Sequence, residues 1–207
     1  MDLLLTDRLT CSRCGPEFGL ILLADRLEDR RVYEGALGCP NCRDRYPVRA
    51  GLGDLRPPPR AGLGDATVLS APDSPTLIEL AGLLGITAGT GHVALLGRMA
   101  GHCEAFAEKL ESVEVVGIAS GLQGWSEAEG VSRLMAGPGL PLRAWSLRGV
   151  ALFGDEGRFA PDEVARVVAR SGRVVVWGDV DGWEAGLSHA GLTVLVSETA
   201  AVVAERP

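Results

Sequence analysis

Short apolar runs alternate with amphipathic stretches between residues 75 and 118, and glycines stand at several of the junctions. The stretch from Pro75 to Gly85 predicts a helix with Ser74 as its N-cap. The elements predicted after it are a strand over 92–96, a glycine turn over 97–101, a helix over 102–110 and a strand over 113–118. Strand, turn, helix and strand in this order are typical of a βαβ unit, so we expect the two strands to be parallel.

The same alternation continues to the end of the chain. The predicted elements are strands over 149–153 and 173–177, helices over 161–170 and 183–190, and final strands over 192–197 and 200–204. Because only Glu198 and Thr199 separate the last two strands, they predict an antiparallel hairpin. Glycine and proline interrupt every pattern in residues 121–147, where no element is predicted. The expected fold class is α/β, with a parallel sheet that ends in an antiparallel hairpin.

Four of the five cysteines stand in two pairs, Cys11 with Cys14 and Cys39 with Cys42, each with two intervening residues. A tight turn of this kind aims two sulfurs at one point, and two such turns supply the four thiolates of a tetrahedral zinc site. Redox pairs or disulfides are the alternatives. Four protein ligands close the coordination sphere, so a zinc ion here would hold the fold and do no chemistry. The pattern predicts a small zinc-ribbon β module with four cysteine ligands at the N-terminus.

A stretch rich in proline and glycine follows the ribbon, over residues 57–74. It predicts a linker between a ribbon domain over 1–56 and a second domain over 75–207. Because the linker is short, we expect the two domains to pack against each other.

The composition narrows the classes of function. Of the 207 residues, 46% are hydrophobic and 23% are charged, and the formal net charge is −7. The chain can therefore bury a core, and it lacks the basic character of a dedicated nucleic-acid binder, although Arg43, Arg45 and Arg49 leave room for such contact. No apolar run reaches the roughly 20 residues that span a bilayer, and the acidic start of the chain is unlike a secretory signal. We expect a cytoplasmic protein that does not associate with membranes.

The residues around the second cysteine pair add to this picture. The chain reads Gly38-Cys39-Pro40-Asn41-Cys42, then Tyr46-Pro47-Val48, then Gly51-Leu52-Gly53-Asp54-Leu55. Over roughly residues 8–56 it resembles the small zinc-binding activator subunit of tRNA, rRNA and release-factor methyltransferases, and the similar ribbon fused ahead of some bacterial methyltransferases. The resemblance implies a zinc-stapled module whose apolar surface docks onto a methyltransferase domain.

Three phrases in the second part resemble class I S-adenosylmethionine (SAM) methyltransferases: Leu140–Leu142, Glu163–Val176 and Ala190–Val194. Their order and spacing agree with that family across roughly residues 75–206, as does the predicted hairpin. The resemblance implies a Rossmann-like domain, with SAM held by a glycine loop after the first strand and by an acidic residue after the second.

The cofactor loop implied by this resemblance is degenerate. Gly97 and Gly101 remain, but Leu95 stands in the acidic place and Met99 in the place of the middle glycine. Leucine cannot bind the ammonium group of the cofactor, and a methionine side chain would occupy space that the cofactor needs.

The other two implied contacts are also altered. The acidic residue at the end of the second strand is replaced by Ala119, and Ser120 after it offers one hydrogen bond at most. Asp155 and Glu156 follow the strand predicted over 149–153, at the rim where open α/β sheets bind ligands, although a solvated loop is the simpler interpretation.

Three hypotheses follow. The first is a degenerate methyltransferase-like protein that binds or scaffolds a protein partner. The second is an active SAM-dependent methyltransferase with an atypical site, which would use Gly97, Gly101, Ser120 or Asp155. The third is a different enzyme or small-molecule binder, with a pocket lined by His92, His102 and Asp155. We also expect a homodimer or another protein partner, with an apolar surface around Gly121–Trp145 as the interface and Trp125 as its anchor.

Overall fold

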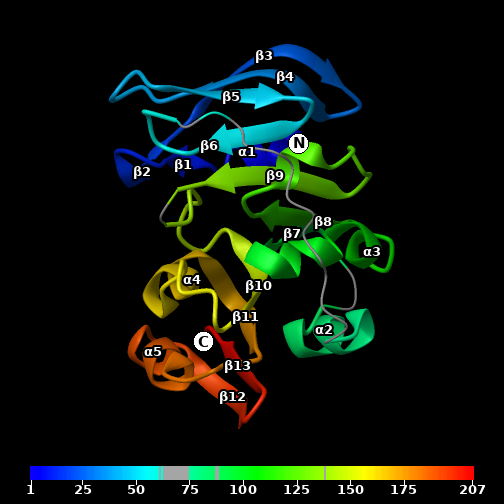
Figure 1. The fold of residues 1–207 in the computed structure, drawn as a ribbon, viewed down its shortest axis with the longest axis vertical. Helices are drawn as coiled ribbons and strands as arrows, with labels where there is room; N and C mark the ends of the chain where they lie inside the picture. The colour runs from blue at the N-terminus through cyan, green and yellow to red at the C-terminus, as the bar shows by residue number, and fades with distance from the viewer. Residues whose placement is uncertain (61, 63–74, 87–88, 138) are drawn as a thin grey trace.

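The computed structural model describes residues 1–60, 62, 75–86, 89–137 and 139–207. An eleven-stranded mixed sheet runs through the molecule, and a two-stranded sheet lies beside it (Figure 1). None of the helices in the described residues combines the length and the apolar character needed to cross a membrane.

Residues 1–60 form a β-rich ribbon. Its elements are α1 (Leu3–Thr6), β1 (Thr10–Cys11), β2 (Gly15–Gly19), β3 (Ile21–Glu28), β4 (Arg31–Gly38), β5 (Arg45–Arg49) and β6 (Leu52–Leu55). Strands β3 to β6 pair antiparallel in chain order, and β1 pairs with β2. The expected N-terminal β module is confirmed.

Residues 75–207 alternate between strands and helices. The elements up to the middle of this part are α2 (Leu77–Leu84), β7 (Gly91–Leu96), the 3-10 helix η1 (Gly97–His102), α3 (Cys103–Ala107), β8 (Val113–Ile118), the 3-10 helix η2 (Leu122–Gly124) and β9 (Val131–Ala136). The remaining elements are β10 (Leu147–Phe153), α4 (Pro161–Val167), β11 (Val168–Trp177), α5 (Trp183–His189), β12 (Thr193–Glu198) and β13 (Ala201–Glu205).

The strand order of this part is β9-β8-β7-β10-β11-β13-β12. Strands β7 to β11 pair in parallel, whereas β13 is antiparallel to both β11 and β12. A parallel sheet that ends in an antiparallel hairpin is the expected α/β fold class, which is confirmed.

The ribbon and the parallel sheet are joined edge to edge. Strand β6 pairs in parallel with β9, from Leu52 opposite Arg133 to Leu55 opposite Ala136. The division into domains over 1–56 and 75–207 stays a prediction, and positions 61 and 63–74 of the expected linker lie outside the described residues.

Two apolar cores cover the two faces of the sheet. Successive residues of a strand point to opposite faces, so Val93 and Leu95 of β7 pack with α2 and α3, while Ala94 and Leu96 pack with α4, α5 and the ribbon. The result is a three-layer arrangement, with helices on both faces of the parallel strands (Figure 1).

The predicted helix start at Ser74 is wrong. Helix α2 begins after Thr76, whose side chain accepts a hydrogen bond from the Glu79 backbone while the Glu79 carboxylate accepts one from the Thr76 backbone. This reciprocal capping box satisfies two N–H groups at the helix start, and Ser74 itself lies outside the described residues.

Two further predictions differ from the structure at helix ends. The helix expected over 102–110 is shorter and is preceded by η1, and the helix expected to reach Arg170 ends at Val167. Strand β11 begins directly at Val168. The predicted turn at Ser171 and Gly172 lies within the strand as an irregularity, where Ser171 has φ +57° and the two residues hydrogen-bond with the Arg206 backbone.

The sequence left residues 121–147 without an assigned element, and in that segment the structure places β9, a central strand. All of its residues are buried, including Ser132 and Arg133. The apolar interface expected around Gly121–Trp145 is therefore wrong for the strand, which is interior. Trp145, after it, is 67% exposed.

Candidate functional site

The strand order places a candidate site between β7 and β10, where the order in which the chain adds strands to the sheet reverses. From β7 the chain proceeds to β8 on one side, and from β10 to β11 on the other. In open α/β sheets, ligands bind outside the carboxyl ends of the strands at this switch point. Here those ends are Leu96 of β7 and Phe153 of β10. The residues that follow them, Gly97, Arg98, Asp155 and Glu156, together with Ser120 after β8, are called the strand-end site below.

The Glu156 carboxylate lies directly on Gly97. A Cβ atom at Gly97 would overlap this carboxylate, and the backbone N–H of Arg98 donates a hydrogen bond to it. Gly97 has φ +56°, a left-handed conformation that favours glycine. Glycine at this position therefore serves a close approach, but the group that approaches is a side chain of the same protein.

Arg98 connects the two acidic residues of the loop after β10. Its guanidinium pairs with Asp155, lies 3.6 Å from the Glu156 carboxylate and stacks over the Phe153 ring at 4.9 Å. Asp155 is half-exposed, whereas only 15% of the Glu156 side chain is exposed. The simpler interpretation of a solvated loop therefore describes Asp155 better than Glu156.

Three other positions implied by the methyltransferase resemblance are buried in the core and are not exposed at this site. Leu95 and Met99 are fully buried in the core beside α2 and α3, and Ala119 is 1% exposed. The expected intrusion of Met99 into the cofactor space is wrong, because its side chain belongs to this core. Ser120 is exposed after β8, and Gly101 lies near the end of η1.

The strand-end site lacks the acidic side chains that the methyltransferase resemblance implies for binding SAM. The side chains of Leu95 and Ala119 supply no hydrogen-bond acceptor. The Glu156 carboxylate fills the space beside Gly97 that a Cβ atom would occupy, which we call the Gly97 cradle. Close backbone approach to a cofactor needs that cradle open.

The four paired cysteines form a second candidate site. Their sulfur atoms all lie within 4.8 Å of one another, with 3.6 Å between Cys11 and Cys42 and 3.9 Å between Cys14 and Cys39. Zn–S bonds of about 2.3 Å give a tetrahedron with edges of about 3.8 Å, so the spacing fits zinc. Turns in the β1–β2 and β4–β5 connections bring the two pairs together.

Polar neighbours surround the sulfurs. The Tyr46 hydroxyl lies 3.2 Å from Cys11 Sγ, and Asn41 Nδ2 donates to Cys14 Sγ at 3.3 Å. Burial raises the pKa of the Cys11 thiol, but hydrogen bonds from Tyr46 and nearby backbone groups outweigh it and lower that pKa to about 7. Thiolates bind metal, so these contacts favour the ligand form of Cys11.

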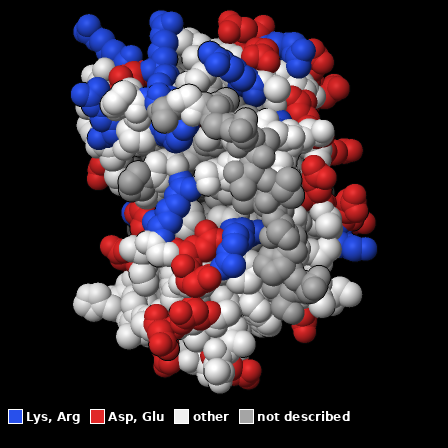
Figure 2. All heavy atoms as spheres, in the orientation of Figure 1, with Lys and Arg blue, Asp and Glu red and all other residues white. Residues whose placement is uncertain are grey.

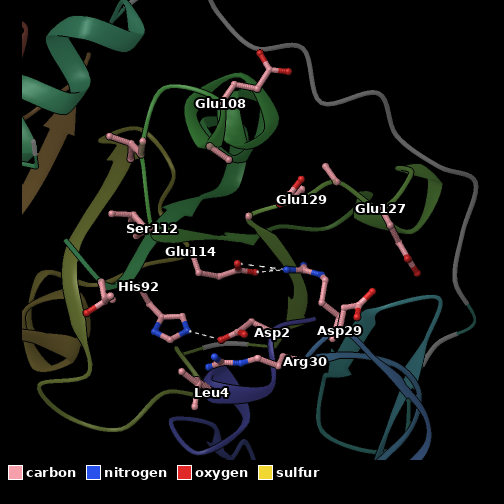
Figure 3. A pocket seen from close by; sticks show the side chains of 18 of the residues that line it. Asp2, Leu4, Asp29, Arg30, His92, Glu108, Ser112, Glu114, Glu127 and Glu129 are labelled. Atoms are coloured by element: carbon pink, nitrogen blue, oxygen red, sulfur yellow. Dashed lines mark hydrogen bonds and ion pairs between the residues drawn. The ribbon is translucent and has the colours of Figure 1, made fainter. Parts of the chain in front are cut away.

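A cavity of about 990 Å³ lies at the amino ends of β7 and β8, at the opposite end of these strands from the strand-end site (Figure 3). Residues of both the ribbon and the parallel sheet line it, and we call it the seam cavity. Asp2, the turn before β4, the end of α3 and the amino ends of β7 and β8 line it. The acidic residues among its lining are Asp2, Asp29, Glu108, Glu114, Glu127 and Glu129.

A series of polar contacts links the residues beside the seam cavity. Arg31 pairs with Glu114 at 3.2 Å, the Ser132 hydroxyl donates to Glu114 at 2.6 Å, and the Asp2 backbone N–H donates to Ser132 at 2.8 Å. The buried His92 ring lies 3.2 Å from the Asp2 carboxylate. Figure 3 marks this contact with a dashed line. Burial raises the pKa of Asp2, but the contact with His92 outweighs it, so the pKa is lowered. These contacts bind the ribbon to β7, β8 and β9.

The pocket expected from His92, His102 and Asp155 does not form. His92 stands at the amino end of β7 and lines the seam cavity, which includes neither His102 nor Asp155. Those two residues belong to η1 and to the loop after β10, at the other end of the strands.

The predicted arginine patch is split by the strand that carries it. Arg45 and Arg49 occupy opposite ends of β5, and Arg43 lies beside the cysteine turn; all three are exposed. Figure 2 shows basic side chains gathered at the upper left, over the end of the ribbon. Nucleic-acid contact through these residues stays a prediction, as does the anchoring role of the partly buried Trp125.

Glu156 is the site residue that the sequence singles out least clearly. Asp155 and Glu156 both follow a strand end, and charge alone does not distinguish the neighbours. The available signal is Gly97, a glycine that the methyltransferase resemblance pairs with an acidic residue, although Leu95 stands in the acidic place here. Only the register of β7 against β10 brings Glu156 to the Gly97 cradle.

No protein-family model matches this chain, and no curated protein sequence matches it significantly. Similar solved structures include a chain of the complex between the Haloferax volcanii Trm112 methyltransferase activator and a candidate methyltransferase (13% identity, TM-score 0.49, 63% of this chain and 89% of that chain). Others are candidate methyltransferases from Bacillus halodurans (16%, 0.47, 58% and 70%) and from Methanococcus maripaludis, the latter SAM-dependent (10%, 0.48, 63% and 83%). At these identities the likeness concerns the fold and assigns no activity to this chain.

Proposed function

We propose that this chain is a methyltransferase-like protein that has lost cofactor binding and acts as a binding or scaffolding module for a protein partner. The observation that carries the proposal is the strand-end site, where Glu156 fills the Gly97 cradle and the two expected acidic places hold the buried Leu95 and Ala119. Two lost hydrogen bonds to charged groups cost about 1.5–3 kcal/mol each, which takes a micromolar site to millimolar affinity or weaker.

The second part of the proposal is a structural zinc ion in the ribbon. Cys11, Cys14, Cys39 and Cys42 would supply all four ligands, so the ion would carry no open position for a substrate. Its role would be to hold together the two cysteine turns of the ribbon. The pairing of β6 with β9 connects the ribbon to the rest of the sheet.

Isothermal titration of SAM and S-adenosylhomocysteine into zinc-loaded protein tests the loss of cofactor binding. We expect no heat of binding at millimolar ligand. Micromolar binding would contradict the proposal and would be followed by a search for the methyl acceptor.

The competing function is an active SAM-dependent methyltransferase with an atypical site. Two observations favour it: Ser120 is exposed at the end of β8, and Asp155 is half-exposed at the end of β10. Both would have to replace contacts that the family resemblance places on acidic residues elsewhere.

A further inference from the structure

The contact between Glu156 and Gly97 is too closely built for a side chain in a solvated loop. The carboxylate lies against the glycine, accepts a hydrogen bond from the Arg98 backbone and is mostly withdrawn from solvent. Three separate features of the chain meet there: the positive φ of Gly97, the backbone N–H that follows it, and the length of a glutamate side chain.

Arg98 holds this arrangement from the solvent side. Its guanidinium is fixed by the Phe153 ring and by Asp155, and from there it faces the Glu156 carboxylate at 3.6 Å. Asp155 therefore positions Arg98, while Glu156 is the group that fills the cradle. The two neighbouring carboxylates have different roles, although both follow the same strand.

We propose that Glu156 determines what the strand-end site can bind, because its carboxylate occupies the Gly97 cradle and excludes an adenosyl cofactor from it. This inference rests on the proposed function and adds a cause to it. The losses at Leu95 and Ala119 weaken a cofactor, whereas Glu156 blocks it. A substitution of Glu156 would remove the carboxylate from the cradle without restoring the acidic residues at positions 95 and 119. The effect of Glu156 on cofactor binding can therefore be measured separately.

Ligand-observed NMR with millimolar S-adenosylhomocysteine provides the first test, on the full zinc-loaded chain. We expect no saturation transfer with the wild-type protein, a clear signal with Glu156→Ala, and none with Asp155→Ala. The last variant is the matched control, because it removes the adjacent carboxylate and one partner of Arg98 but leaves Glu156 available to Gly97. Circular dichroism would verify that each variant is folded.

The outcomes separate this inference from the proposed function. If Glu156→Ala is folded and gives no signal, Glu156 is not the barrier, and the inference is overturned while the loss of cofactor binding stands. If the wild-type protein binds the ligand and Glu156→Ala binds it more weakly, Glu156 is a cofactor contact, and both proposals fall.

A double-mutant cycle tests the contact without any ligand. In the wild-type background, Gly97→Ala introduces a Cβ that collides with the carboxylate, in addition to the strain of its positive φ. In the Glu156→Ala background the φ strain persists but the collision is absent. We expect Gly97→Ala to reduce the ratio of folded to unfolded protein by a larger factor when Glu156 is present, because the end of that side chain must then move off the glycine. Equal effects in the two backgrounds would overturn the inference.

Discussion

Arg133 and Glu163 show how hydrogen bonds compensate for the burial of a charged side chain. Arg133, 5% exposed in the middle of a central strand, donates to the backbone carbonyls of Trp125 and Ala50. Burial lowers the pKa of Arg133. Because a buried charge without partners is costly, these two carbonyls are what permits an arginine in β9.

Glu163 illustrates the same principle at the end of the sheet. Its carboxylate accepts hydrogen bonds from Arg166 at 2.8 Å and from the Leu140 backbone at 2.7 Å, and Arg166 in turn donates to the carbonyls of Leu140 and Leu142. Burial raises the pKa of Glu163, but the bonds with Arg166 and Leu140 outweigh it, so the pKa is lowered. The pair thus fastens the loop before β10 to α4.

We predict that Glu163→Gln lowers the free energy of unfolding by about 1.5–3 kcal/mol at neutral pH, because a charged acceptor is lost. A lowered pKa stabilises the fold above the unfolded value of about 4.3, and this contribution is lost as pH falls through the folded pKa. Urea denaturation of both proteins from pH 7 to pH 3 measures the difference, which should shrink in acid. The exposed Glu111→Gln is the control; a difference that persists at pH 3 would contradict the prediction.

At the scale of elements, the two ends of α2 depend on contacts between residues that are close together in the chain. The capping box of α2 joins Thr76 to Glu79, with 2.9 Å from the Thr76 backbone nitrogen to the carboxylate. The helix stops at Gly85, as predicted, and the structure shows that Gly85 has the left-handed conformation. Strand partners, in contrast, depend on distant segments, as β9 and β6 show.

We predict that Thr76→Ala destabilises the protein by about 0.5–2 kcal/mol, since the first turn of α2 loses its side-chain cap. Guanidinium denaturation would measure this change. Thr199→Ala, at the exposed turn between β12 and β13, should have a smaller effect. Equal effects of the two variants would show that the cap contributes nothing.

At the scale of the whole molecule, the ribbon and the parallel sheet are one continuous structure. The β6–β9 pairing and the polar contacts of Arg31 and Asp2 cross the seam between them. Because the sheet does not stop at the seam, we expect the two parts to unfold together.

Loss of zinc should therefore also lower the stability of the parallel sheet, which lies outside the ribbon. All four tryptophans lie between residues 125 and 183, so their fluorescence reports on the second part alone. We predict that Cys39→Ser abolishes stoichiometric zinc and lowers the denaturation midpoint reported by tryptophan. Cys103→Ala, which removes the buried cysteine outside the cluster, should keep its zinc. An unchanged tryptophan transition in Cys39→Ser would show that the two parts unfold independently.

Much of the fold was predictable because its signals are local. Apolar runs bounded by glycine identified β7, β8, β10 and the final hairpin, and the spacing of the cysteines identified the cluster. Strand β9 was missed because Ser132 and Arg133 break its apolar pattern, and the partners that make them acceptable are distant in the chain. The start of β11 was missed because Val168 continues the apolar pattern of the helix before it.

The sequence by itself determined most of the elements after residue 75, the fold class and the candidate metal ligands, since each of these signals depends on residues that are near one another in the chain. It also shows Leu95 and Ala119 in the two places where the methyltransferase resemblance implies acidic residues. Only the tertiary structure decided that the ribbon extends the parallel sheet, that Met99 packs in the core, and that Glu156 fills the Gly97 cradle. These depend on strand register and side-chain direction, which bring together groups that are distant in the chain and are set by the packing of the whole sheet.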